Sequence, residues 1–104
     1  MVKFEVADRG QGPSWWLSEN GELLAWPGRY FASMAFAERE AAAFKAAAAS
    51  ATFEIFRSSE GWRWRAVQPV DYCMAYSPGA FTRPAQARKA GREIRHKVQH
   101  AVGP

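Results

Sequence analysis

Apolar and polar residues alternate along residues 53–65, on both sides of a polar turn. Phe53 and Ile55 flank an acidic residue before the turn, while Trp62 and Trp64 alternate with arginines after it. This two-residue period, interrupted by Ser and Gly, predicts a half-buried antiparallel hairpin. One face of the hairpin should therefore contribute to a core, and the other should carry charged side chains.

The same pattern occurs earlier in the chain. Phe4-Glu5-Val6 matches Phe53-Glu54-Ile55, Trp15-Trp16 falls where Arg63-Trp64 comes, and Gly28-Arg29-Tyr30 matches Gly79-Ala80-Phe81, at offsets of 49, 48 and 51 residues. An alanine-rich run follows each copy. Repetition at a nearly fixed period indicates two similar supersecondary units. We therefore expect an α+β fold with an internal pseudo-twofold, in which a β-β-β-α unit occurs twice (about 2–50 and 51–104) within a single domain, 1–104.

The first unit is expected to contain strands over 4–7, 14–18 and 22–26. Asn20-Gly21 is predicted as a hairpin turn, because both residues tolerate positive φ. A helix is expected over 33–49 with Ser33 as its cap. Its apolar stripe would consist of Met34, Ala37, Ala41, Phe44 and Ala48.

The second unit continues the hairpin with a third strand over 71–76, after an irregular connection through Gln68-Pro69-Val70. Its helix is expected to begin near 82–84, with Pro84 acceptable in a first turn. The buried stripe of this helix would consist of Ala87, Gly91, Ile94, Val98 and Ala101.

These motifs together resemble the YegP-like family of small bacterial and archaeal proteins, which occur as tandem repeats or as homodimers of one repeat. The resemblance rests on residues 53–56 and 61–65, on Asn20-Gly21-Glu22, and on the Gly-x-aromatic step before each helix. It implies one antiparallel sheet shared by both repeats, with two helices on one face. It supplies no catalytic residue and no established activity.

The chain departs from the family pattern in three places. Trp15 and Leu17 stand where the outward face usually carries polar or basic residues. Residues 68–71 replace an Asn-Gly turn, and no closing strand follows the second helix, which predicts one uncovered sheet edge.

Charge is distributed unevenly over the 104 residues, which carry a formal net charge of +4. Residues 1–51 sum to −1 and residues 52–104 to +5. The single cysteine, Cys73, excludes an intramolecular disulfide and favours a reducing cytoplasm. No apolar run approaches the ~20 residues of a membrane span, and the strand pattern begins at once, so neither a signal peptide nor membrane association is predicted.

The sequence offers little for catalysis. His96 and His100 share a helix face at a spacing that can chelate a metal, but no further ligands lie nearby in the sequence. Cys73 lies in an apolar strand without an adjacent base, as a core thiol would. We therefore expect neither enzymatic activity nor a cofactor or metal, and interpret the histidines as solvated.

The face of the sheet opposite the helices is the first candidate binding surface. Strict alternation would place Trp16, Trp62 and Trp64 inward, and the other side chains outward: Trp15, Leu17, Phe56, Arg63 and Arg65. Trp, Phe and Arg are enriched in interface hot spots. We therefore expect an accessory protein that binds a protein partner, or a second copy of itself, through this face; the alternative is that loops cover it.

The second helix supports an alternative function. Glu93 is the only acidic residue in 83–104, whereas the predicted helix carries Arg88, Lys89, Arg92, Arg95 and Lys97. Such a basic face can follow a phosphate backbone, which would make the protein a nucleic-acid-binding module. A solvated helix surface is the remaining interpretation.

Overall fold

Three strands precede a helix twice along the chain. The computed structural model describes residues 1–69 and 72–104. The strands are β1 (Val2–Asp8), β2 (Pro13–Glu19), β3 (Glu22–Ala25), β4 (Thr52–Ser58), β5 (Gly61–Gln68) and β6 (Tyr72–Tyr76), and the helices are α1 (Met34–Ala47) and α2 (Pro84–Gln99). The α+β class is confirmed. The predicted strand start at Asp71 and part of the predicted 68–71 connection lie outside the described residues.

The strands form two antiparallel sheets, ordered β1-β2-β3 and β4-β5-β6. The expectation of one sheet shared by both repeats was wrong, because each repeat forms its own sheet. Between the sheets, Trp26 and Tyr76 form an isolated bridge, in which their backbone N–H groups donate to each other's carbonyls at 3.3 and 2.8 Å. Pro78 lies two residues beyond Tyr76, where the next hydrogen-bonded pair would need a backbone N–H. Because proline has no N–H to donate, the pairing cannot continue as a regular ladder there.

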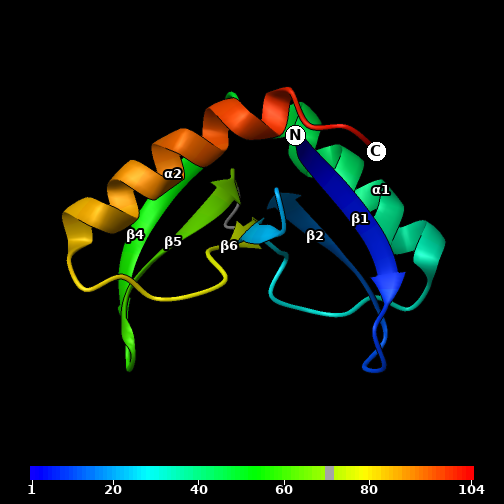
Figure 1. The fold of residues 1–104 in the computed structure, drawn as a ribbon, viewed down its shortest axis with the longest axis horizontal. Coiled ribbons are helices and arrows are strands. Elements are labelled where there is room, and N and C mark those ends of the chain that lie inside the picture. The colour runs from blue at the N-terminus through cyan, green and yellow to red at the C-terminus, as the bar shows by residue number, and fades with distance from the viewer. Residues whose placement is uncertain (70–71) are drawn as a thin grey trace.

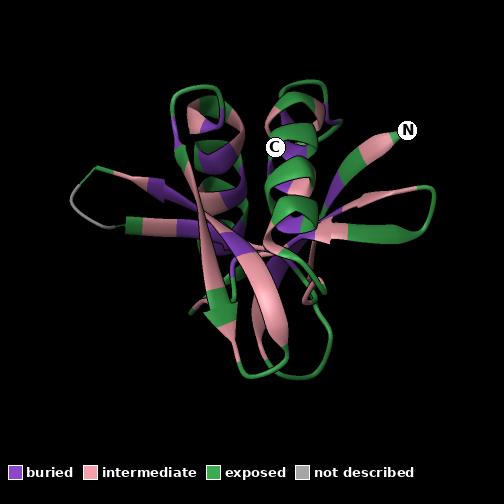
Figure 2. Cartoon of the chain, turned by 90° about the vertical axis from the view of Figure 1, so that its left-hand side faces the viewer, coloured by how far each residue is buried: buried purple, intermediate pink, exposed green. Residues whose placement is uncertain are grey.

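Both helices lie above the strands in the view of Figure 1. α1 packs on β1 and β2, and α2 packs on β4 and β5. α1 also contacts β6, a strand of the other sheet. Figure 2 shows that the buried parts of both helices face the strands, whereas their outer turns are exposed. Among the described residues, no helix has the length and apolar character needed to cross a bilayer.

The start of α1 is set by its N-cap, Ser33. The Ser33 hydroxyl accepts a hydrogen bond from the Phe36 N–H at 3.0 Å, which satisfies one of the free donors of the first turn. The predicted stripe is buried at Ala37, Ala41, Phe44 and Ala48, but Met34 is exposed and does not belong to it.

α2 begins at Pro84, and the Arg83 N–H donates to the Gln86 side chain at 3.1 Å. Its predicted stripe is buried throughout, from Ala87 to Ala101. After the helix, the chain turns back along β1: the Phe4 N–H donates to the Val102 carbonyl and the Val102 N–H to the Val2 carbonyl, each at 2.9 Å. Part of the β1 edge is therefore covered.

The Asn20-Gly21 turn forms as predicted, with φ values of 51° and 84°. It joins β2 to β3, whose register places Glu19 opposite Glu22. Positive φ at both positions matches the twist of the flanking strands.

Candidate functional site

The side chains of Trp15 and Leu17 belong to the core, so their predicted outward placement was wrong. Both are 0% exposed. The Trp15 indole stacks on Phe44 of α1 and meets the Phe4 ring edge-on, each at a centroid distance of 5.4 Å. Neither residue can therefore contribute to an open sheet face.

The error is a one-residue slip in the comparison of β2 with β5. Trp15 pairs with Val6, and Trp64 pairs with Ile55. The helix-facing indole of β2 is thus Trp15, and Trp16 takes the opposite face of the sheet. Because the side-chain period of a strand is two, a slip of one residue reverses every side chain. Trp64 itself is buried, as predicted.

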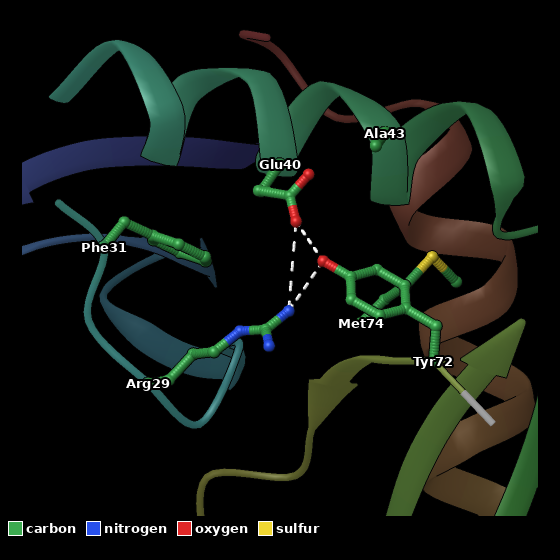
Figure 3. A pocket seen from close by; sticks show the side chains of 6 residues that line it. All are labelled: Arg29, Phe31, Glu40, Ala43, Tyr72 and Met74. Carbon is green, nitrogen blue, oxygen red and sulfur yellow. Dashed lines mark hydrogen bonds and ion pairs between the residues drawn. The ribbon is translucent and has the colours of Figure 1, made fainter. Parts of the chain in front are cut away.

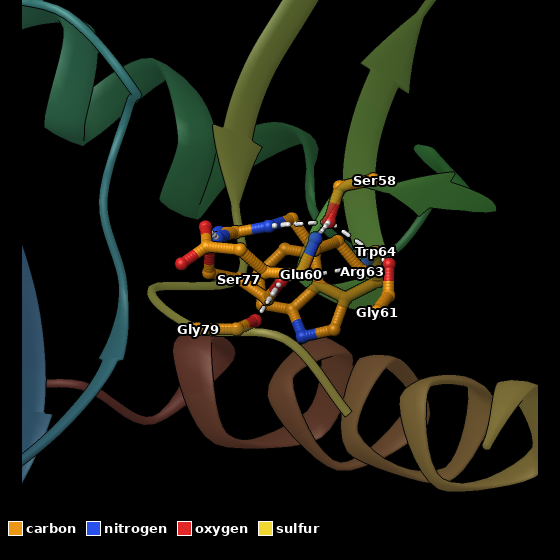
Figure 4. Close-up of polar contacts among 7 residues, drawn as sticks. All are labelled: Ser58, Glu60, Gly61, Arg63, Trp64, Ser77 and Gly79. Atoms are coloured by element: carbon orange, nitrogen blue, oxygen red, sulfur yellow. Dashed lines mark hydrogen bonds and ion pairs between the residues drawn. The ribbon is translucent and has the colours of Figure 1, made fainter. Parts of the chain in front are cut away.

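The remaining residues of the predicted sheet face are half-buried, and their guanidinium groups are hydrogen-bonded to neighbouring side chains. The Arg65 guanidinium lies 5.0 Å from the centre of the Phe56 ring and donates to Glu54 at 2.8 Å. Arg63 donates to Glu60 at 2.8 Å and to the Ser58 hydroxyl at 3.2 Å (Figure 4). The cations of this face therefore already have internal partners.

The arginine face of α2, which we define as Arg88, Arg92 and Arg95, differs in this respect. With Phe53 and Ile55 of β4, these arginines line a shallow groove of about 180 Å³. Their spacing of four and three residues places them on one side of the helix. None of the three forms an ion pair with another described residue.

The basic residues predicted for this surface differ in how firmly other groups of the protein hold them. Lys97 donates to Glu19 at 2.8 Å, which neutralises it and raises its pKa. Lys89 is exposed. Arg95 is partly fixed, because its Nη2 donates to the Ala51 carbonyl at 2.9 Å and its guanidinium lies 5.0 Å from the centre of the Phe53 ring.

Unpaired positive charge gathers at α2. Within the described chain, the carboxylates that form ion pairs do so with cations outside the arginine face. The other cations that form no ion pair with a described residue are scattered over β1, α1 and β4: Lys3, Arg39, Lys45 and Arg57. The α2 region, by contrast, concentrates them: Arg83, Arg88, Lys89, Arg92 and Arg95.

A second feature is a site between α1 and β6 that the protein fills with its own side chain. The Tyr72 phenol donates to the Glu40 carboxylate and accepts from Arg29 Nη2 at 2.6 Å (Figure 3). Desolvation and the Glu40 carboxylate raise the pKa of Tyr72. With Phe31 and Met74 completing the walls, only about 10 Å³ of free volume remains. We call this the filled site.

A larger cavity lies between α2 and β3. It has a volume of about 360 Å³, within the range of small-molecule sites. Its apolar wall includes Leu24, Trp64, Phe81 and Ile94, and small residues line the rest of that wall: Pro78, Gly79, Ala80 and Ala90. Glu22, Glu93 and Lys97 supply its charged groups. We call this the open cavity.

Sequence reasoning missed both of these sites. The signal available was the row of small residues at 78–80 and at Ala90. A run of Pro, Gly and Ala reads as a turn, however, and the opposite wall comes from a strand more than fifty residues earlier. Only the tertiary arrangement brings them together.

The residues considered for catalysis are not brought together. His96 of α2 and His100, which directly follows the helix, are both exposed, and Cys73 is half-buried with its thiol 3.7 Å from the Ala75 carbonyl. Within the described ranges, no group of three His, Cys, Asp or Glu residues is placed to hold a metal ion. Comparison of the chain with protein-family models, curated proteins and solved structures finds no match.

Proposed function

We propose that the protein is a non-catalytic binding module that holds a nucleic-acid strand on the arginine face of α2. The observation that carries this proposal is a groove beside β4 that is lined by three arginines, none of which forms an ion pair with another described residue. Burying or clustering cations without acidic partners costs free energy through mutual repulsion. A phosphate backbone would relieve that repulsion and release condensed counterions.

The arginine face is long enough to meet more than one phosphate of a strand. Arg88 and Arg95 are separated by about 10 Å along the helix axis. Guanidinium groups bind phosphate oxygens in a bidentate manner. Glu93, the only acid of α2, instead lines the open cavity on the other flank. The binding should therefore be driven by charge and show little sequence preference.

The direct test is fluorescence anisotropy with labelled 20-nucleotide single-stranded DNA and RNA at low salt. Arg92→Ala should weaken binding several-fold. Arg39→Ala is the matched control, since Arg39 is also an exposed, unpaired arginine but lies on α1. No binding at low salt, or equal losses for both variants, would reject the proposal.

The sheet face remains a second candidate, as a surface for a protein partner or a second copy of the chain. It is favoured by the half-exposed cluster of Phe56, Arg63 and Arg65, in which a guanidinium already covers an aromatic ring. Sedimentation at increasing protein concentration tests self-association. Phe56→Ser should lower the associated fraction, and a concentration-independent monomer would remove the homodimer from consideration.

We also propose that the two β-β-β-α units are copies of one module related by a pseudo-twofold, as the YegP-like resemblance implies. Reciprocal contacts support this. Lys45 of α1 donates to the Ala101 carbonyl beyond α2, and Arg95 of α2 donates to the Ala51 carbonyl beyond α1. The lone Cys73 supports a cytoplasmic location.

A further inference from the structure

We propose that the open cavity is a binding site for a small arylalkylamine, a ligand with one six-membered aromatic ring and a protonated amino group on an alkyl chain. This site is separate from the arginine face, so it does not depend on the proposed nucleic-acid binding. The inference rests on the residues that line the cavity, on their charges, and on the similar arrangement of the filled site.

The filled site shows which group this framework accommodates. There, a phenol ring lies between α1 and β6 against Phe31 and Met74, and its polar atom donates to a carboxylate of the helix. The open cavity has the same construction between α2 and β3, with Phe81 and Leu24 on its walls. The two phenylalanines are held alike: the Phe31 N–H donates to the Pro13 carbonyl at 2.7 Å, and the Phe81 N–H to the Trp62 carbonyl at 2.6 Å.

The two sites differ in the side chains that occupy them. Arg29, Glu40 and Tyr72 occupy the filled site. The open cavity instead has Gly79 and Ala90 on its walls. With these smaller side chains on its walls, the open cavity has about 360 Å³ of free volume, against about 10 Å³ in the filled site. An aromatic ring from a ligand would therefore occupy space that a protein side chain takes in the other site.

The charge of the cavity selects a cation. Lys97 is neutralised by Glu19, at 2.8 Å. Glu22 and Glu93 also line the cavity, and neither forms an ion pair with another described residue. An ammonium group near these carboxylates would be attracted, whereas a ligand carboxylate would be repelled. The half-buried aromatic ring of Phe81 adds a favourable surface for a cation or a ring.

The probe is tyramine, titrated into the ¹⁵N-labelled protein and followed by amide chemical shifts. A ligand of this size in a half-open site should bind with a dissociation constant on the order of 0.1–1 mM. Shifts should concentrate at Phe81, Ala90 and Ile94. The matched anionic probe, 3-(4-hydroxyphenyl)propionate, should bind at least about tenfold more weakly because of the two carboxylates.

Two variants test the site itself. Ala90→Met should fill the cavity and weaken tyramine binding about tenfold or more, whereas Ala85→Met, exposed on the same helix, should leave it within about twofold. If Ala90→Met does not fold, Glu93→Gln replaces it and should weaken tyramine about threefold while leaving p-cresol unchanged.

Three results would overturn the proposal: no shifts with tyramine at millimolar concentration, equal binding of the cationic and anionic probes, or tyramine affinity unchanged in both Ala90→Met and Glu93→Gln. Shifts of the cavity amides with protein concentration alone would also overturn it, because a second copy would then be the occupant. A failure of nucleic-acid binding leaves these readouts unaffected.

Discussion

The indole of Trp15 stacks on the ring of Phe44, with 5.4 Å between the ring centres and 19° between the planes. This contact joins β2 to α1. In the other half, Trp64 of β5 packs against Phe53 at 5.4 Å. Each sheet therefore places one covered indole beneath its helix, since Trp64 also lies against Gly91 of α2.

Trp15→Ala should accordingly lower the free energy of unfolding by about 3–5 kcal/mol, because it leaves a large cavity beneath α1. Trp64→Ala should have a similar cost. Leu23→Ala, at a position 37% exposed, is the control and should cost less than about 1 kcal/mol. Urea unfolding followed by circular dichroism measures all three, and a small effect for Trp15→Ala would mean that its stacking does not hold the helix.

The local elements could be read from the sequence because their signals are local. Ser33, Pro84 and Asn20-Gly21 each act through the backbone within a few residues, and all three mark the boundaries that the structure shows. The helix stripes are equally local, except at Met34. That residue lies in the first turn, where the helix has not yet reached the sheet.

Which side chains of β2 point to the core could not be predicted in the same way. Trp15, Trp16 and Leu17 are consecutive and apolar, so alternation does not identify the inner face. The offset of 49 residues at Phe4-Glu5-Val6 pairs Trp15 with Trp64, but the two adjacent tryptophans also allow the offset of 48, which pairs Trp16 with Trp64. The turn after β1 is closed by Asp8, whose carboxylate accepts from the Gly10 and Gly12 N–H groups at 2.9 and 3.1 Å.

The contacts that cross between the helices give a second prediction. Lys45 Nζ donates to the Ala101 and Gly103 carbonyls at 2.6 and 3.1 Å, and Arg95 makes the equivalent bond to Ala51. Lys45→Ala and Arg95→Ala should each cost about 1–2 kcal/mol, since both remove charged hydrogen bonds to carbonyls. Arg92→Ala makes no such bond and should cost less than about 0.5 kcal/mol. Thermal unfolding of the three variants compares them, and a ranking with Arg92 as the costliest would contradict the assignment.

The ion pair between Glu19 and Lys97 gives a pH dependence. The Lys97 hydrogen bond lowers the pKa of Glu19 from its ordinary value of 4.5. The pair therefore stabilises the fold above that value, and the stabilisation is lost as the pH falls through the lowered pKa. The pKa of Lys97 is raised, so the alkaline limit lies above its ordinary value of 10.5.

Glu19→Gln should thus be less stable than the parent at pH 7, and the difference should vanish at sufficiently low pH. Urea midpoints from pH 2 to pH 8 measure this difference. Glu22→Gln, which removes an unpaired carboxylate on the next strand, should show no comparable convergence. A gap between Glu19→Gln and the parent that widens in acid would have the wrong sign for this ion pair.

Tyr72 should stabilise the filled site through its hydroxyl. Tyr72→Phe removes the bonds to Glu40 and Arg29 and should cost about 1 kcal/mol. Tyr30→Phe is the control, because Tyr30 is exposed to a similar extent (39% against 38%) and its ring packs on Trp26. The raised pKa of Tyr72 means that this stabilisation is present below pH 10 and is lost as the pH rises through that pKa. Equal stability of Tyr72→Phe and the parent at pH 7 would contradict this role.

The role of the arginine face is tested most directly by the salt dependence of single-stranded DNA binding. The parent and the Arg88→Ala/Arg92→Ala double variant would be compared by plotting the logarithm of the association constant against that of the salt concentration. Each lost phosphate contact should reduce the magnitude of the slope by about 0.7, so the double variant should fall by about 1.4. An unchanged slope would contradict the account, because the phosphates would then be held elsewhere.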